Sequence, residues 1–112
     1  MQTARTGNAH VLLFRSGETE SNILNLSQGV TGAFIVPPGS PAIGRTIQFV
    51  EVGPDYMDFP ETNLLSTPKT LVAGHNPLTA AELERVSMAT RCRFVLGSAA
   101  PSDLTIHLLW KS

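Results

Sequence analysis

The chain has 112 residues, enough for one domain that buries roughly two-thirds of its unfolded surface without metal or disulfide support. Charged residues make up 15% of the chain and the formal net charge is −1, which excludes the broad basic surface of a nucleic-acid-binding protein. The 9 glycines and 8 prolines stand between apolar runs, a distribution typical of the loops of an all-β domain.

The N-terminal residues 1–9 carry no apolar pattern and are expected to form an arm held by a neighbouring subunit, which leaves residues 10–112 as the single domain. They also lack the apolar segment of a signal peptide, and no apolar run in the chain is long enough to cross a bilayer. The single cysteine, Cys92, cannot form a disulfide within the chain, so we expect assembly in the cytoplasm.

Three strands are predicted in the first part of the domain. The apolar run at 10–15 indicates a strand with both faces partly covered. Alternating residues at 22–27 predict the second strand, and 31–39 predicts the third. The third strand should end at Pro37 and Pro38, because proline cannot donate a hydrogen bond to a neighbouring strand.

The stretch TIQFVEVGPDYMDF (46–59) predicts a strand, a turn and a return strand. Ile47 and Phe49 share one face, but Val50 has the opposite parity, so either a β-bulge shifts the strand or both of its faces are covered. The Gly-Pro-Asp turn at 53–55 is followed by a return strand from Tyr56 to Phe59.

The second half predicts one more strand at 69–74, a helix at 78–86 and two clear final strands. The helix is indicated by Thr79 and Glu82, which have the spacing of a capping box. Residues 91–96 and 103–110 each place alternate apolar residues on one face, and the short linker between them predicts a closing hairpin. The whole pattern predicts an all-β sandwich, jelly-roll-like or Ig-like, of about eight strands with one short helix.

No catalytic, cofactor or metal site is predicted from the polar residues. The histidines at positions 10, 75 and 107 are scattered, and His107 is expected to face solvent beside the core strand face that ends in Trp110. Asp55 and Asp58 could form an acid–base or calcium pair, but Asp55 fits a turn former better. Cys92 alternates with core residues and should be a buried, inert thiol.

Arg91 and Arg93 share a strand face and could suit an acidic partner, although a solvated sheet face is the more ordinary interpretation.

The chain from His10 onward resembles the small β-sandwich structural proteins encoded among the virion genes of tailed bacteriophages. The matching stretches are SGETESNILNLS, GAFIVPP, TIQFVEVGPDYMDF and RFVLGSAAPSDLTIHLLWK. The resemblance implies a non-enzymatic capsid decoration or cement protein on the virion surface, or a minor tail or connector component. It implies no cofactor, and as partners the major capsid protein and copies of the chain itself, as a trimer.

Partner contacts are expected in the arm, the proline-rich loop and the turn after the fourth strand, at Gln2, Thr3, Arg5, Pro37, Pro38 and Tyr56. A similar strand order occurs in discoidin-like jelly-roll modules that bind carbohydrate. Under that alternative Tyr56 beside Asp55 is the stacking platform for a sugar, since Trp110 is expected in the core. Neither nucleic acid nor membrane is expected as a partner.

Overall fold

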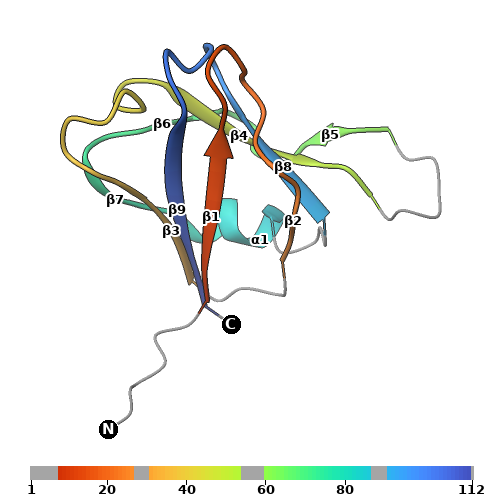
Figure 1. Ribbon diagram of the computed structural model, residues 1–112. Coiled ribbons are helices and arrows are strands. Elements are labelled where there is room, and N and C mark those ends of the chain that lie inside the picture. Colours follow the sequence, from red (N-terminus) through yellow and green to blue (C-terminus); the bar gives the residue numbers. More distant parts are fainter. Residues whose placement is uncertain (1–7, 27–30, 54–59, 87–90, 112) are drawn as a thin grey trace, which may run out of the picture.

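The computed structural model describes residues 8–26, 31–53, 60–86 and 91–111, which form two antiparallel sheets and one short helix (Figure 1). Sheet A has the order β1-β9-β3-β7, and sheet B has the order β2-β8-β4-β5, with β6 also paired to β4. The strands of sheet A are β1 (Asn8–Phe14), β9 (Leu104–Lys111), β3 (Thr31–Val36) and β7 (Gly74–Pro77). Those of sheet B are β2 (Leu24–Asn25), β8 (Arg91–Leu96), β4 (Thr46–Glu51), β5 (Thr62–Asn63) and β6 (Lys69–Thr70).

The strand pairs are nested along the chain, with the first strand paired to the last. β1 pairs with β9, β2 with β8, β3 with β7, and β4 with β5 and β6, and every pair is antiparallel. This nesting is the jelly-roll arrangement, in which successive strands pass between two packed sheets. The predicted all-β sandwich is therefore confirmed, and the strand order is that of a jelly roll.

The core lies between the two sheets and is centred on three phenylalanines. The rings of Phe34, Phe49 and Phe94 meet with centroids 4.6 to 6.0 Å apart, in tilted and edge-on arrangements that aromatic pairs favour. The predicted inward faces of the last two strands are also confirmed. They supply Cys92, Phe94, Leu96, Leu104, Ile106, Leu108 and Trp110, all buried.

The two faces of β4 are both covered. Its register with β8 is continuous from Ile47 opposite Leu96 to Glu51 opposite Cys92, so no bulge interrupts the strand. Ile47 and Phe49 point into the core, whereas Gln48 and Val50 are buried on the opposite face. Of the two interpretations that the sequence allows, covered faces are the observed one.

The helix α1 (Ala80–Val86) begins after Thr79 and lies against the β5–β6 edge of sheet B. The predicted capping box is confirmed: Thr79 N–H donates to Glu82 Oε1 at 2.9 Å, and Glu82 N–H donates to Thr79 Oγ1 at 3.2 Å. Val86 is fully buried, so the helix adds its last turn to the core. Among the described residues, no helix is long and apolar enough to cross a membrane.

The predicted closing hairpin between 91–96 and 103–110 is wrong. β8 lies in sheet B between β2 and β4, while β9 lies in sheet A between β1 and β3. The linker crosses from one sheet to the other and is held by hydrogen bonds to earlier segments: Gly97 N–H donates to the Thr46 carbonyl, and Ala100 N–H to that of Glu18. A short linker can therefore bridge two sheets as well as join two neighbouring strands.

Several predicted strand bounds also change. The strand predicted at 22–27 is reduced to Leu24–Asn25, and the one predicted at 69–74 is divided between β6 and β7, which lie in different sheets. β1 begins at Asn8, two residues before the predicted domain start. The return strand predicted at 56–59 lies outside the described residues, and the described strands that pair with β4 are β5, β6 and β8.

Candidate interaction surface

The outer face of sheet A presents two rows of side chains that cross all four strands. One row runs Val11, His107, Ile35 and His75, and the other runs Ala9, Leu109, Ala33 and Pro77, as the pairings of β1, β9, β3 and β7 place them. These positions alternate with the buried core residues of the same strands, so their side chains point away from the core. We call this surface the A face.

The A face is mainly apolar and open. Val11 is 47% exposed, and Leu13, Ala33, Ile35 and Leu109 are half-buried. The four strands of sheet A contain no acidic residue, and their ionisable residues are the three histidines and Lys111. The largest apolar patch of a monomeric protein covers roughly 300 to 600 Å² and often has a binding role, so the A face is a candidate interaction site.

A shallow hollow of about 280 Å³ lies on the A face. It is lined by Thr31, Gly32, Ala33, His75, Pro77 and Leu109. Ala33 sits in the middle strand of this group, opposite Leu109 on one side and Pro77 on the other. The hollow is therefore the place where a small side chain is flanked by larger ones.

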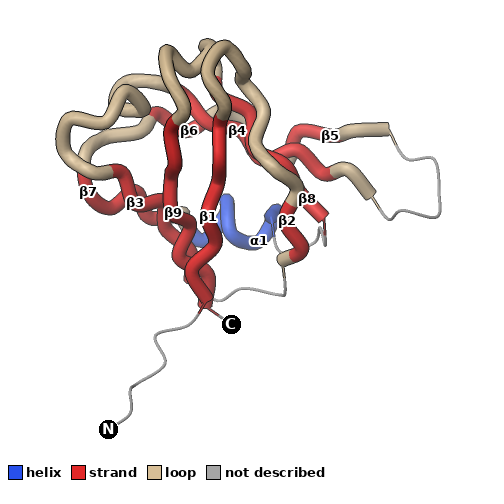
Figure 2. The backbone as a smooth tube through the Cα atoms, in the orientation of Figure 1, coloured by secondary structure: helices blue, strands red, loops and turns tan. Residues whose placement is uncertain are grey.

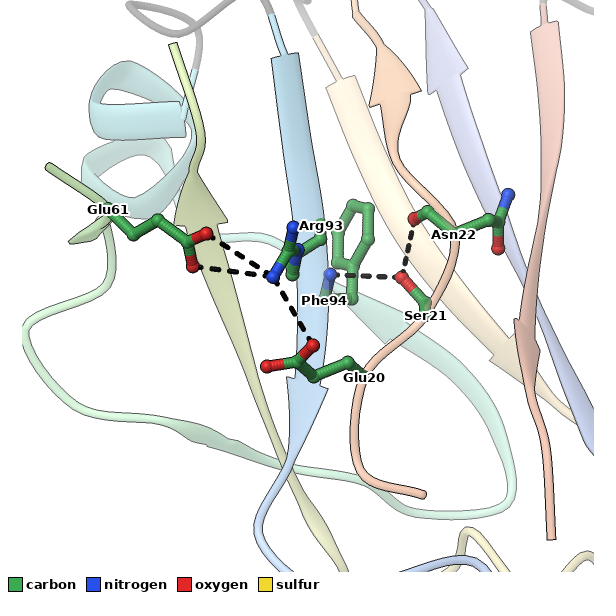
Figure 3. Close-up of polar contacts among 6 residues, drawn as sticks. All are labelled: Glu20, Ser21, Asn22, Glu61, Arg93 and Phe94. Atoms are coloured by element: carbon green, nitrogen blue, oxygen red, sulfur yellow. Dashed lines mark hydrogen bonds and ion pairs between the residues drawn. The ribbon is translucent and has the colours of Figure 1, made fainter. Parts of the chain in front are cut away.

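The outer face of sheet B is different, because charged side chains bind one another across it. Arg93 on β8 lies between two carboxylates, with Nη1 3.2 Å from Glu20 Oε1 and 3.3 Å from Glu61 Oε2 (Figure 3). Ser21, next to Glu20, accepts a hydrogen bond from Phe94 N–H at 3.0 Å and donates one to the Asn22 carbonyl at 2.8 Å. Arg93 therefore pairs with carboxylates of the same chain on both sides of β8, and its side chain is only 22% exposed.

The neighbouring Arg91 also binds within the chain, since its Nη1 donates to the Gly53 carbonyl at 2.7 Å. The segment between β5 and β6 is held beside β4 by Gln48, whose amide binds both the N–H and the carbonyl of Leu65. Sheet B therefore pairs Gln48, Arg91 and Arg93 within the chain, in contrast to the apolar A face.

Four loops gather at the end of the sandwich opposite the start of β1, where Figure 2 shows them in tan. They are residues 15–23, 37–45, 71–73 and 97–103. Pro37 and Pro38 end β3 there as predicted, and both are exposed. Two exposed apolar residues stand in the same loops, Ile43 at 40% and Val72 at 54%, and Gly44 N–H donates to the Leu71 carbonyl between them at 2.9 Å.

Of the predicted partner-binding residues, the structure describes Pro37 and Pro38 only. Gln2, Thr3, Arg5 and Tyr56 lie outside the described residues, as do Asp55 and Asp58.

The predictions for three core and surface residues are confirmed. His107 is exposed, Trp110 is buried, and Cys92 is a fully buried thiol. Burial, with a smaller contribution from the charge of Glu51, raises the pKa of Cys92 to about 12. Cys92 therefore stays protonated and unreactive at neutral pH.

The A face is the feature that sequence reasoning missed as a site. Its signal was the apolar run at 10–15, where Val11 and Leu13 alternate with the core residues Leu12 and Phe14. His75 and His107, which are far apart in the sequence, are brought into one row on either side of Ile35. In the part of the chain that the structure describes, no group of three His, Cys, Asp or Glu side chains could hold a metal ion.

A scan against protein-family models, a search of curated proteins and a search of solved structures each found no match to this chain.

Proposed function

We propose that the protein is a non-enzymatic structural component of a bacteriophage virion, a capsid decoration or cement protein that acts through contacts with protein surfaces. The observation that supports this proposal best is the A face, an open apolar surface across four strands without an acidic residue. Such a surface suits another protein better than a small polar substrate, since association removes apolar area from water.

The virion role in this proposal is supported by the fold and by the resemblance of the sequence stretches to virion proteins. Jelly rolls serve as capsid domains, but they also serve as lectin domains and cupins, so the fold alone supports the virion role only by analogy. In the proposed role the chain binds the assembled capsid lattice at the virion surface. Binding to the assembled state only would stabilise it by mass action. The exposed prolines 37 and 38 then contribute contacts to the capsid protein.

The proposal is tested by the copy number of this chain in purified virus particles, measured by quantitative mass spectrometry against the major capsid protein. A ratio of whole copies per capsid subunit, or per symmetry axis, is the expected result. A few copies per particle would instead favour the tail or connector role, and absence from the particles would overturn a virion role altogether.

A further inference from the structure

We propose that the A face binds the A face of a second copy of this chain, in a two-fold dimer in which sheet A packs on sheet A. The inference deepens the proposed function by naming one partner of this surface, and it rests on that function only for its biological setting. The surface must meet a partner that is apolar and brings no buried charge, because unpaired charges are costly away from water. A second A face fulfils both conditions.

The arrangement of side chains supports a copy of the chain more specifically. A two-fold axis parallel to the strands, between β9 and β3, reverses the strand order, so that β9 lies over β3 of the second copy and β1 over its β7. Each row then lies over itself. Leu109 meets the hollow at Ala33 of the second copy, and His107 meets the second copy's Ile35.

Leu109 thus faces the small Ala33 at the centre of this packing, and His107 faces the aliphatic Ile35 instead of another histidine. At the border, Val11 lies over His75 of the second copy and Ala9 over its Pro77. Interdigitation of this kind is how two stacked sheets pack with about 10 Å between them.

The area of the A face sets the expected affinity of the dimer. With strands about 4.8 Å apart and about 3.4 Å per residue, the four strands span roughly 400 Å² on each copy. A total of about 800 Å² lies below the roughly 1,200 Å² at which stable specific interfaces begin, in the size range of weak and transient contacts, so association is reversible and depends on concentration. We therefore expect a monomer–dimer equilibrium with a dissociation constant in the micromolar range or weaker.

The test is sedimentation velocity of the full chain from about 1 μM to about 1 mM, with three variants. Val11→Lys puts a charge on the A face, and Val72→Lys is the matched control, since Val72 is also an exposed valine (54% against 47%) but lies in the 71–73 loop. Ala33→Leu fills the hollow without adding charge. We expect Val11→Lys and Ala33→Leu each to raise the dissociation constant at least about tenfold, and Val72→Lys to leave it unchanged. Circular dichroism confirms that each variant is folded.

A chain that stays monomeric to 1 mM, a monomer–trimer equilibrium, or a dimer that resists Val11→Lys would each overturn the inference. These outcomes are independent of the copy number in virus particles, so failure of the dimer and failure of the virion role are distinguishable.

Discussion

At the residue scale, the side chain of Gln48 makes the two hydrogen bonds to Leu65 that the backbone of a neighbouring strand would otherwise make. Leu65 lies in the segment that joins β5 to β6. The Gln48 side chain accepts from Leu65 N–H at 2.9 Å and donates to the Leu65 carbonyl at 3.0 Å, and both residues are buried. Gln48→Leu would leave two buried backbone groups unpaired, so we expect a loss of about 2 to 4 kcal/mol in the free energy of unfolding. Urea denaturation followed by fluorescence of Trp110 measures the loss.

The control for this change is Asn63→Leu, at an exposed position on the adjacent strand β5. It should alter the free energy of unfolding by less than about 0.5 kcal/mol, as surface substitutions usually do. If Gln48→Leu were equally mild, the two hydrogen bonds to Leu65 would have no role in stability.

At the element scale, α1 depends on the reciprocal bonds of Thr79 and Glu82 and on Lys69, whose Nζ lies 3.1 Å from Glu82 Oε1. Burial of the Glu82 carboxyl acts to raise its pKa, but the Thr79 N–H bond and the nearby Lys69 outweigh burial, so the pKa lies below its ordinary value. Because the folded-state pKa is lowered, the stabilisation is present above the unfolded-state pKa and is lost as the pH falls through the folded-state value.

Thr79→Ala should therefore cost about 1 kcal/mol at neutral pH, as the loss of a helix cap usually does. Glu82→Gln should flatten the acid branch of the stability profile, so that stability falls less than in the wild type between about pH 5 and about pH 3. Thermal unfolding across this pH range measures both effects. Glu84→Gln, an exposed neighbour on the same helix, is the control and should keep the wild-type profile.

The elements that the sequence predicted correctly are those with a complete local signal. β8 and β9 have an apolar, buried residue at every second position over 92–96 and 104–110, and α1 has both members of its capping box. β2, β5 and β6 have two residues each, too few for any periodicity, and tertiary pairing alone defines them. The two covered faces of β4 were visible as a conflict of parity at Val50, although the residues that cover the second face were not.

At the scale of the whole molecule, the sequence predicted a sandwich but not the partners of its strands. The linker at 97–103 fits a hairpin, yet β8 and β9 each have two neighbours from earlier in the chain, which leaves them no shared edge. The A face was hidden for the same reason. Val11, His107, Ile35 and His75 form a row only after four distant strands are aligned, and no local pattern encodes that alignment.

The nested pairing also has a kinetic consequence, because the pair that closes sheet A joins residues from the two ends of the described chain. Asn8 lies opposite Trp110, so the pairing of β1 with β9 closes a loop of about a hundred residues, and such distant contacts slow folding. β1 begins and β9 ends at the same end of the sandwich (Figure 1).

A circular permutant with its old termini joined by a glycine-serine linker, and cut between the exposed Pro101 and Ser102, would turn the β1–β9 pair into a hairpin. We expect it to keep the fold and to refold at least about threefold faster than the wild type in stopped-flow dilution from urea. A permutant of equal stability that refolds at the wild-type rate would show that closure of β1 on β9 does not limit folding, and that the slow step lies in the inner pairs of the roll.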